Sequence, residues 1–257
     1  MGRAIIKTEN QIKVIRDSGK YLNELLYLIY QNCKPGVSLL ELEDLAQSFI
    51  EKNNLKGAFK GYMGFPANLC LSVNDCVVHG IPNNYILKDG DLLKVDSGVI
   101  YKKGFSDSAF SIIIGGDDKD VAGAELIKIT KKALDVSINF LLSDSYSFDY
   151  SKSVQDIVEN AGFCVIRDLT GHGVGTKVHE APHIFNWTHP DTKKIKIKKN
   201  MVLALEPITS FNSKHVINKK GNSWNLYTSK GDKGAQWEYM ILVKDDNIEV
   251  LSGLQLV

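Results

Sequence analysis

The chain has 257 residues, of which 44% are hydrophobic and 24% are charged, and its formal net charge is +1. This balance is typical of a globular enzyme, and the near-neutral charge gives no general attraction to DNA or to a membrane surface. No apolar run is long enough to span a bilayer, and residues 1–20 lack the apolar segment of a signal peptide. We therefore expect a cytoplasmic protein.

The first half of the chain predicts two helices followed by strands. Apolar residues recur at helical spacing over residues 8–32, and the stretch KPGVS at 34–38 ends this pattern. Ser38 and Glu41 then form a capping box, which predicts a second helix over about residues 38–54. Strand-like segments follow at 68–75, 76–82, 91–101 and 104–115. A turn at Lys102–Gly104 predicts that the last two form a hairpin.

The second half repeats this order of patterns. Helices are predicted over residues 119–143 and 147–162, and strands return within 200–211 and 235–252. The stretch LKDGDLLKVD (87–96) matches IKKNMVLALE (197–206) at an offset of 110, and the helices that begin near residues 38 and 147 match at an offset of 109. An internal duplication explains this pattern, and chance similarity is the alternative. Because no linker-like stretch separates the halves, we expect residues 1–257 to form a single domain.

Four acidic residues stand in apolar, strand-like stretches: Asp96, Asp107, Glu206 and Glu238. A buried carboxylate is costly unless it is paired or binds a cation. Any one of these acids alone would more often be hydrogen-bonded or exposed, but four together favour a metal site. Carboxylates with an imidazole suit a bridged pair of Mn, Fe, Co or Zn ions.

His172 is the candidate imidazole, because it lies between two glycines in GHGVGTKVHE (171–180). His179 follows seven residues later, and His79 ends a strand-like stretch before Gly80. A lone histidine is more often structural than a ligand, but this combination is more specific. No role is assigned to the remaining histidines, which are His183, His189 and His215.

Two other features have simple interpretations. The cysteines, Cys33, Cys70, Cys76 and Cys164, form no C-x-x-C pair, so we expect free thiols. The lysine-rich run at 191–200 is predicted to be a solvated edge strand whose lysines oppose aggregation, and a contact with ribosomal RNA is the alternative.

The order of these residues, with the stretches GHGVGTKVHEAPHIFNW, LALEPIT and GAQWEYMILV, resembles the bacterial type I methionine aminopeptidases. The resemblance covers nearly the whole chain. It implies a fold of the α/β (α+β) class called the pita-bread fold. In that fold, two pseudo-symmetric halves, each made of two helices and an antiparallel sheet, surround a dinuclear metal site.

The resemblance also implies a role for each site residue. Two divalent ions (Co, Mn, Fe, Zn or Ni) would be held by Asp96, Asp107, His172, Glu206 and Glu238. Glu206 would also manage the proton of a metal-activated water that attacks the first peptide bond. His79 and His179 would bind the scissile amide and the developing oxyanion. The methionine pocket would be formed by Tyr62, Phe65, Cys70 and Trp224.

The implied substrates are nascent polypeptides that begin with methionine and have a small second residue. Gly2 would make this chain its own substrate. We expect a monomer of the short form, without an N-terminal extension, that binds neither membranes nor DNA. Association with ribosomes is the alternative role of the lysine-rich run. The chain departs from the family pattern at Ser106, Leu169 and Val178, and we expect these departures to alter the pocket's shape rather than the metal ligands.

Two alternatives are open on the same fold. One is an X-Pro aminopeptidase or prolidase, which shares the ligands but usually carries an extra N-terminal domain. The other is a non-catalytic binding protein, which would have lost metal ligands. The intact ligand set and the stretch GYMGFPANLC (61–70), which matches the methionine pocket loop, favour the methionine aminopeptidase.

Overall fold

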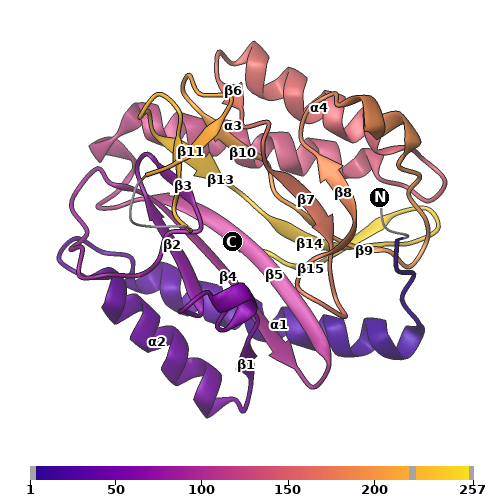
Figure 1. Ribbon diagram of the computed structural model, residues 1–257, viewed down its shortest axis with the longest axis horizontal. Coiled ribbons are helices and arrows are strands. Elements are labelled where there is room, and N and C mark those ends of the chain that lie inside the picture. The colour runs from indigo at the N-terminus through magenta and orange to yellow at the C-terminus, as the bar shows by residue number, and fades with distance from the viewer. Residues whose placement is uncertain (1–3, 220–223, 255–257) are drawn as a thin grey trace.

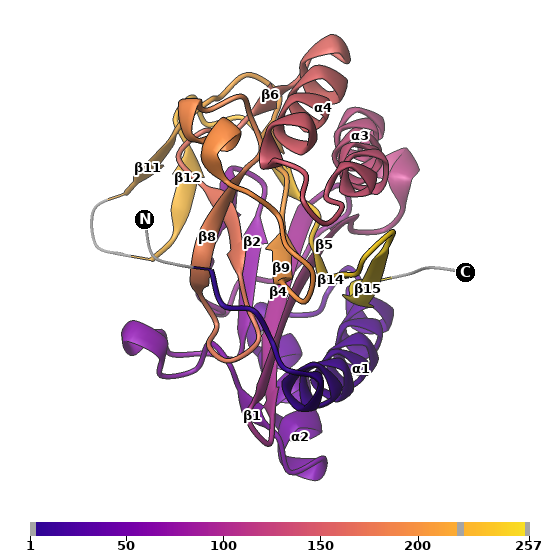
Figure 2. The ribbon, with the colours of Figure 1, turned by 90° about the vertical axis from the view of Figure 1, so that its right-hand side faces the viewer.

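The computed structural model describes residues 4–219 and 224–254, so the prediction for Gly2 lies outside the described residues. Its helices cover one side of a set of antiparallel sheets (Figures 1 and 2). The helices are α1 (Glu9–Asn32), α2 (Leu39–Lys52), α3 (Val121–Ser137) and α4 (Ser147–Asn160), with short 3-10 helices η1 (Tyr62–Gly64), η2 (Asp117–Lys119), η3 (Ile138–Phe140) and η4 (Pro190–Lys194). No described helix is long and apolar enough to cross a membrane.

The strands of the first half are β1 (Lys56–Gly57), β2 (Leu69–Val73), β3 (Cys76–Val78), β4 (Leu92–Tyr101) and β5 (Gly104–Ile113). Those of the second half are β6 (Cys164–Val165), β7 (Thr170–Gly173), β8 (Glu180–Phe185), β9 (Val202–Leu205), β10 (Ile208–Ser210), β11 (Val216–Asn218), β12 (Leu226–Thr228), β13 (Gly234–Gln236), β14 (Tyr239–Val243) and β15 (Ile248–Ser252). Every pairing described between these strands is antiparallel.

Two of the sheets carry most of the architecture. In the first half, β4 pairs with β5 along one edge and with β2 and β1 along the other. In the second half, the strand order is β15-β14-β9-β7-β8. The remaining sheets, β13-β10-β6 and β11-β12-β3, are shorter, and the latter joins β3 of the first half to β12 of the second. The halves are therefore connected by strand pairing as well as by the chain.

Local sequence signals explain where the helices begin. Thr8 with Gln11, and Ser38 with Glu41, form complete capping boxes at the starts of α1 and α2. Each box satisfies backbone N–H groups that have no partner within the helix. Both helices bury one apolar face in a core shared with α3 and α4. The predicted helix over 38–54 is thus confirmed in position and in mechanism.

The internal repeat is visible in the backbone. Buried positions Leu39, Leu42, Ala46 and Ile50 of α2 correspond to Ser147, Tyr150, Val154 and Val158 of α4 at an offset of 108. The predicted offset of 109 was therefore wrong by one residue. Corresponding helices of the two halves must both turn their apolar faces toward the core, and these faces match only at an offset of 108. The offset of 110 is confirmed for the turns, since Gly90 and Asn200 both have positive φ, at 81° and 64°.

Several predicted boundaries need correction. The helix over 119–143 is shorter, because α3 ends at Ser137 and continues only as the 3-10 helix Ile138–Phe140. The lysine-rich run is not an edge strand: it contains η4 and an isolated bridge from Lys196 to Tyr146. Its lysines are exposed, and Lys194, Lys196 and Lys199 pair with neighbouring acids. All four cysteines are free thiols, as predicted.

Candidate metal centre and active site

The hairpin β4–β5 brings two aspartates to one face of its sheet. In its register, Asp96 is opposite Ala109 and Asp107 is opposite Gly98. The two carboxylates therefore occupy diagonal positions on the same face, where side chains are within reach of one another. Lys102, with φ of 53°, starts the two-residue turn that sets this register. The predicted hairpin is confirmed, and both side chains are buried.

Two glutamates flank the end of a ladder in the second half. Leu205 of β9 is opposite Tyr239 of β14, so Glu206 leaves this ladder at the point where Glu238 enters it. Both acids lie next to the strands rather than inside them, which corrects the prediction of strand positions. The backbone N–H of Glu238 donates to the carbonyl of Ala109 at 2.9 Å. This bond ties the second pair of acids to the hairpin that carries the first.

His172 lies on β7, between β9 and β8. Its Nδ1 is 2.9 Å from the carbonyl oxygen of Gly173, which can only accept a hydrogen bond. Nδ1 must therefore carry the proton, and Nε2 keeps a free lone pair. That Nε2 lies 3.6 Å from Oε1 of Glu206 and 3.8 Å from Oδ2 of Asp107.

Burial shifts the pKa of every ionisable group in this cluster toward the neutral form. Burial raises the pKa of Asp96 to about 7, and it raises those of Asp107, Glu206 and Glu238 well above their ordinary values, with repulsion between neighbouring carboxylates adding to the shift. Burial lowers the pKa of His172 to about 3. The four carboxylates are thus held where their negative charge is unfavourable. A bound cation would lower their pKa values again, and it would keep the imidazole of His172 neutral.

The unpaired atoms of the cluster fit a metal ion. Oδ1 of Asp96 and Oε1 of Glu238 are buried and accept no hydrogen bond from any residue in the described ranges. Single ligand atoms of Asp107, His172 and Glu238 lie within 4.8 Å of one another. Buried acceptors without donors are rare in native proteins unless an ion or water satisfies them. Oxygen and imidazole donors of this kind suit Mn, Fe, Co or Zn.

The two other histidines predicted for the site lie beside this cluster. The His179 ring centroid is 4.3 Å from that of His172 and 5.3 Å from that of Tyr62. His79 has a left-handed backbone with φ of 58°, and its ring lies 6.3 Å from Trp224. Burial lowers the pKa of both imidazoles, that of His79 to about 4, so neither carries a charge at neutral pH.

All the residues predicted for the site line one cavity of about 600 Å³. Phe65 and Cys70 belong to an apolar cluster that also contains Val178, and Trp224 packs against this cluster. The Phe65 and Trp224 rings meet edge to face at 5.2 Å. Tyr62 is exposed at the rim. The cavity therefore combines a polar centre with an apolar pocket.

The three departures from the family pattern have different positions. Leu169 lines the cavity, and Val178 belongs to the apolar cluster that forms its wall. Ser106 does not line the cavity: its hydroxyl contacts Ser18 of α1 and the carbonyl of Val99. It alternates with Asp107 along β5, so its side chain points to the opposite face. The expectation that Ser106 alters the pocket was therefore wrong.

Two residues near the cluster were quoted in the motifs without a role. Gln236 donates from Nε2 to Oε2 of Glu206 at 3.2 Å. Glu180 is buried directly after His179 and also lines the cavity. Gln236 could have been found by its position two residues before Glu238, at the end of β13. The partners of Glu180 are distant in sequence, so no local signal identifies them.

The chain matches the model of Metallopeptidase family M24 over residues 13–245. The chain belongs to this family. Among the M24 relatives, it is 37% identical to a methionine aminopeptidase from Clostridium perfringens, covering 96% of this chain and 98% of the relative. A crystal structure of methionine aminopeptidase from Thermotoga maritima superimposes with a TM-score of 0.93 at 34% identity, covering 98% of this chain and all of that one.

This M24 chain also resembles a prolidase structure from Pyrococcus horikoshii, with a TM-score of 0.75 and 19% identity. This chain spans 64% of that structure, and at such identity the likeness shows the fold alone. The predicted pita-bread fold of mixed helix and sheet is thus confirmed by solved M24 structures. The nearly full-length match to methionine aminopeptidases does not favour the proline-directed alternative.

Proposed function

We propose that this protein is a methionine aminopeptidase that removes the N-terminal methionine of nascent polypeptides when the second residue is small. The observation that carries the proposal is the cavity, in which a five-residue acid and imidazole cluster adjoins an apolar pocket. The named M24 relatives support the same activity over nearly the whole chain. Because its substrates are nascent chains, we place the enzyme in the cytoplasm.

The metal ligands in this proposal are Asp96, Asp107, His172, Glu206 and Glu238. Two divalent ions, when bound, would supply Lewis acidity to the scissile carbonyl and acidify a water molecule. The fixed tautomer of His172 presents a lone pair rather than a proton to the cluster. Glu206 is the least buried of the four acids and faces the open cavity, so it is suited to accept a proton from the attacking water.

His79 and His179 are uncharged and border the same cavity. Each neutral imidazole can donate one hydrogen bond and accept another. In our proposal they hold the scissile amide and stabilise the charge that develops on its oxygen, an effect that fixed donors provide best in a dry site. The aromatic contacts of His79 with Trp224 and of His179 with Tyr62 restrict both rings.

The apolar wall accounts for the choice of methionine. Phe65, Cys70 and Trp224 surround a space suited to an unbranched thioether side chain. Contacts between sulfur and aromatic edges are favourable but small, so shape and burial contribute more. The second substrate residue would lie close to the cluster, which favours small side chains there.

The exposed lysines at 193–199 are a candidate contact with ribosomal RNA. Because three lysines of this run pair with nearby acids, only part of its charge is free to attract phosphate. Replacing Lys193 and Lys198 with Glu is expected to reduce co-sedimentation with ribosomes. Unchanged co-sedimentation would remove this proposal without affecting the proposed activity.

The activity is tested with metal-stripped protein titrated separately with Mn, Fe, Co, Zn and Ni. We expect release of methionine from a Met-Gly peptide, little release from a Met-Lys peptide, and none of alanine from an Ala-Pro peptide. Glu206→Gln should abolish the reaction while leaving the fold intact by circular dichroism. Cleavage of Ala-Pro instead would identify the proline-directed activity, and inactivity with every metal would favour a binding protein.

A further inference from the structure

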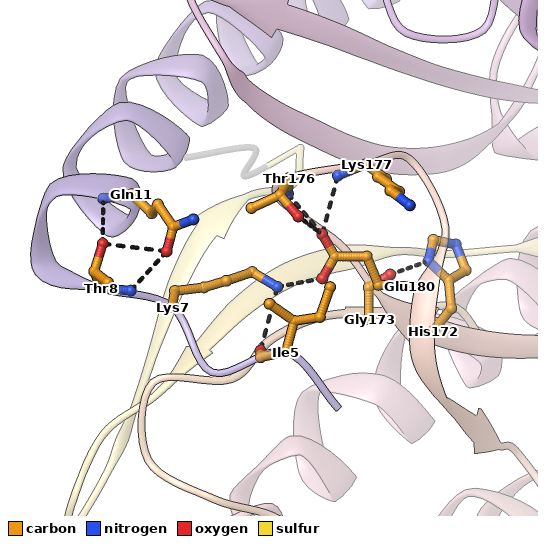
Figure 3. A network of polar contacts seen from close by, with 9 residues as sticks. All are labelled: Ile5, Lys7, Thr8, Gln11, His172, Gly173, Thr176, Lys177 and Glu180. Atoms are coloured by element: carbon orange, nitrogen blue, oxygen red, sulfur yellow. Dashed lines mark hydrogen bonds and ion pairs between the residues drawn. The ribbon is translucent and has the colours of Figure 1, made fainter. Parts of the chain in front are cut away.

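Glu180 has an unusually complete set of partners for a carboxylate beside an active site. One oxygen pairs with Nζ of Lys7. The other accepts from the Thr176 N–H at 2.7 Å, the Thr176 hydroxyl at 2.6 Å and the Lys177 N–H at 3.0 Å (Figure 3). Both side chains of the ion pair are about 1% exposed. The side chains of the pair therefore lie inside the protein, although Glu180 and the preceding His179 both border the cavity.

These bonds close the segment 174–179, which joins β7 to β8. Backbone hydrogen bonds also join the segment to two strands. The N–H of Val174 donates to the carbonyl of Val202 in β9, and the N–H of Phe105 in β5 donates to the carbonyl of Gly175. Gly175 has φ of 122°, and a Cβ there would lie only 2.6 Å from a methyl carbon of Ile15. The segment is thus packed tightly between β5, β9 and α1.

Lys7 reaches this segment from the other end of the sequence. Its backbone N–H donates to the carbonyl of Asn200 at 2.9 Å, and the next residue, Thr8, caps α1. Figure 3 shows its side chain extended from the start of α1 to Glu180. A buried ion pair adds little stability compared with apolar residues of the same size, but its two charged groups must stay in one relative position. The pair therefore contributes here by fixing the carboxylate of Glu180 relative to Lys7.

Two residues of the segment contact the groups that line the cavity. Val178 packs with Phe65 and Cys70 in the apolar wall. His179 stands beside the rings of His172 and Tyr62. Glu180 accepts from the backbone N–H groups of residues 176 and 177 and directly follows His179, so its hydrogen bonds close a short loop of chain that contains His179.

We propose that Glu180, paired with Lys7, is a positioning residue that sets the orientation of His179. The activity part of this inference rests on the proposed function. Through this ion pair, Lys7, which lies just before α1, supports the geometry of the site. An imidazole displaced by about 1 Å can lower the rate by one to two orders of magnitude without a matching change in substrate binding.

A double-mutant cycle between Glu180 and His179 tests the proposal in the metal-loaded enzyme. Glu180→Gln is expected to lower kcat about tenfold with KM within about twofold. In a His179→Ala background, the same substitution should change kcat by less than about twofold, because the residue acts through the imidazole. An equal loss in both backgrounds would overturn the proposal in favour of a general structural role.

A second measurement does not depend on activity. In protein with isotope-labelled histidines, the His179 ring signals, assigned with His179→Ala, should shift in Lys7→Met and return with Lys7→Arg. The ring signals of the exposed His215 should stay unchanged in both. Arg16→Met, which breaks the partly buried pair with Glu249, is the matched control and should shift neither. Unshifted His179 signals in Lys7→Met would overturn the proposal even if the protein were inactive.

Discussion

The individual carboxylates of the cluster show how burial and charge oppose each other. Asp96 and Glu238 each keep a buried oxygen without a donor among the described residues, and Asp107 lies within a few ångströms of His172. In water these acids would be ionised at neutral pH. In the protein their pKa values are raised, so the metal-free site holds protons that a cation must displace.

We therefore expect Mn²⁺ binding to release protons at pH 7. A raised pKa means that the metal-free acid is partly protonated, so the affinity for Mn²⁺ should increase with pH and level off above the raised values. Each released proton corresponds to about a tenfold gain in affinity per pH unit. Calorimetric titrations in PIPES and in Tris, which differ in ionisation enthalpy, should give different apparent enthalpies. Equal enthalpies in both buffers would contradict the protonated state of the cluster.

At the scale of elements, the turn after β3 holds His79 in a conformation that non-glycine residues rarely adopt. Gly80, the next residue, donates from its N–H to the hydroxyl of Ser72 and accepts from the N–H of Leu71. The N–H of Ile81 donates to the side chain of Asn225, which precedes β12. The turn is thus fixed by two neighbouring strands, and a Cβ on Gly80 would lie 2.2 Å from the carbonyl oxygen of Leu71.

Gly80→Ala is expected to displace this turn. The added methyl group has no space, so we expect a loss of about 1–3 kcal/mol in the free energy of unfolding. Because His79 moves with the turn, kcat for a Met-Gly peptide should fall at least about tenfold. Urea unfolding and steady-state kinetics measure the two effects.

Gly162→Ala is the matched control for the turn variant. Gly162 also has a positive φ, at 87°, but no atom lies within 4 Å of the position that a Cβ would occupy there. The added methyl group therefore meets open space, and only the backbone conformation is strained. We expect a loss of about 1 kcal/mol in stability with no change in kcat. Similar kinetics for the two variants would show that the packing around Gly80 does not matter for His79.

At the scale of the whole molecule, the cluster lies where the two halves of the repeat meet. Asp96 and Asp107 come from the β4–β5 hairpin, whereas His172, Glu206 and Glu238 come from the second half. Figures 1 and 2 show the helices of both halves outside the sheets that carry these residues. A cation at the centre would therefore link the halves, and its binding free energy would add to the stability of the fold.

Saturating Mn²⁺, at about 100 times its Kd, should raise the free energy of unfolding by about 2.7 kcal/mol. For a chain of this size, that corresponds to a rise in Tm of about 5–10 °C. Differential scanning calorimetry with and without the metal measures the rise. Glu238→Gln removes one ligand and should abolish most of it, so an equal rise in this variant would place the ion elsewhere.

Much of the fold and of the candidate site could be predicted from the sequence, because local patterns report burial and capping. The capping box at Ser38 located α2, and the apolar stretches around Asp96 and Asp107, with the turn at Lys102–Gly104 between them, located the hairpin. The strands β7 and β8 were not predicted, although β7 carries His172. They are short, and glycines and polar residues hide the alternation of a strand.

By itself, the sequence determined which side chains were available for the site and the repeated order of elements that carries them, since both follow from residue type and spacing. Only the tertiary structure decided which atoms meet. The unpaired oxygens of Asp96 and Glu238, the fixed tautomer of His172, and the pairing of Lys7 with Glu180 all depend on contacts between distant segments. Such contacts leave no local pattern, because a partner more than a hundred residues away is brought near only by the packing of the whole chain.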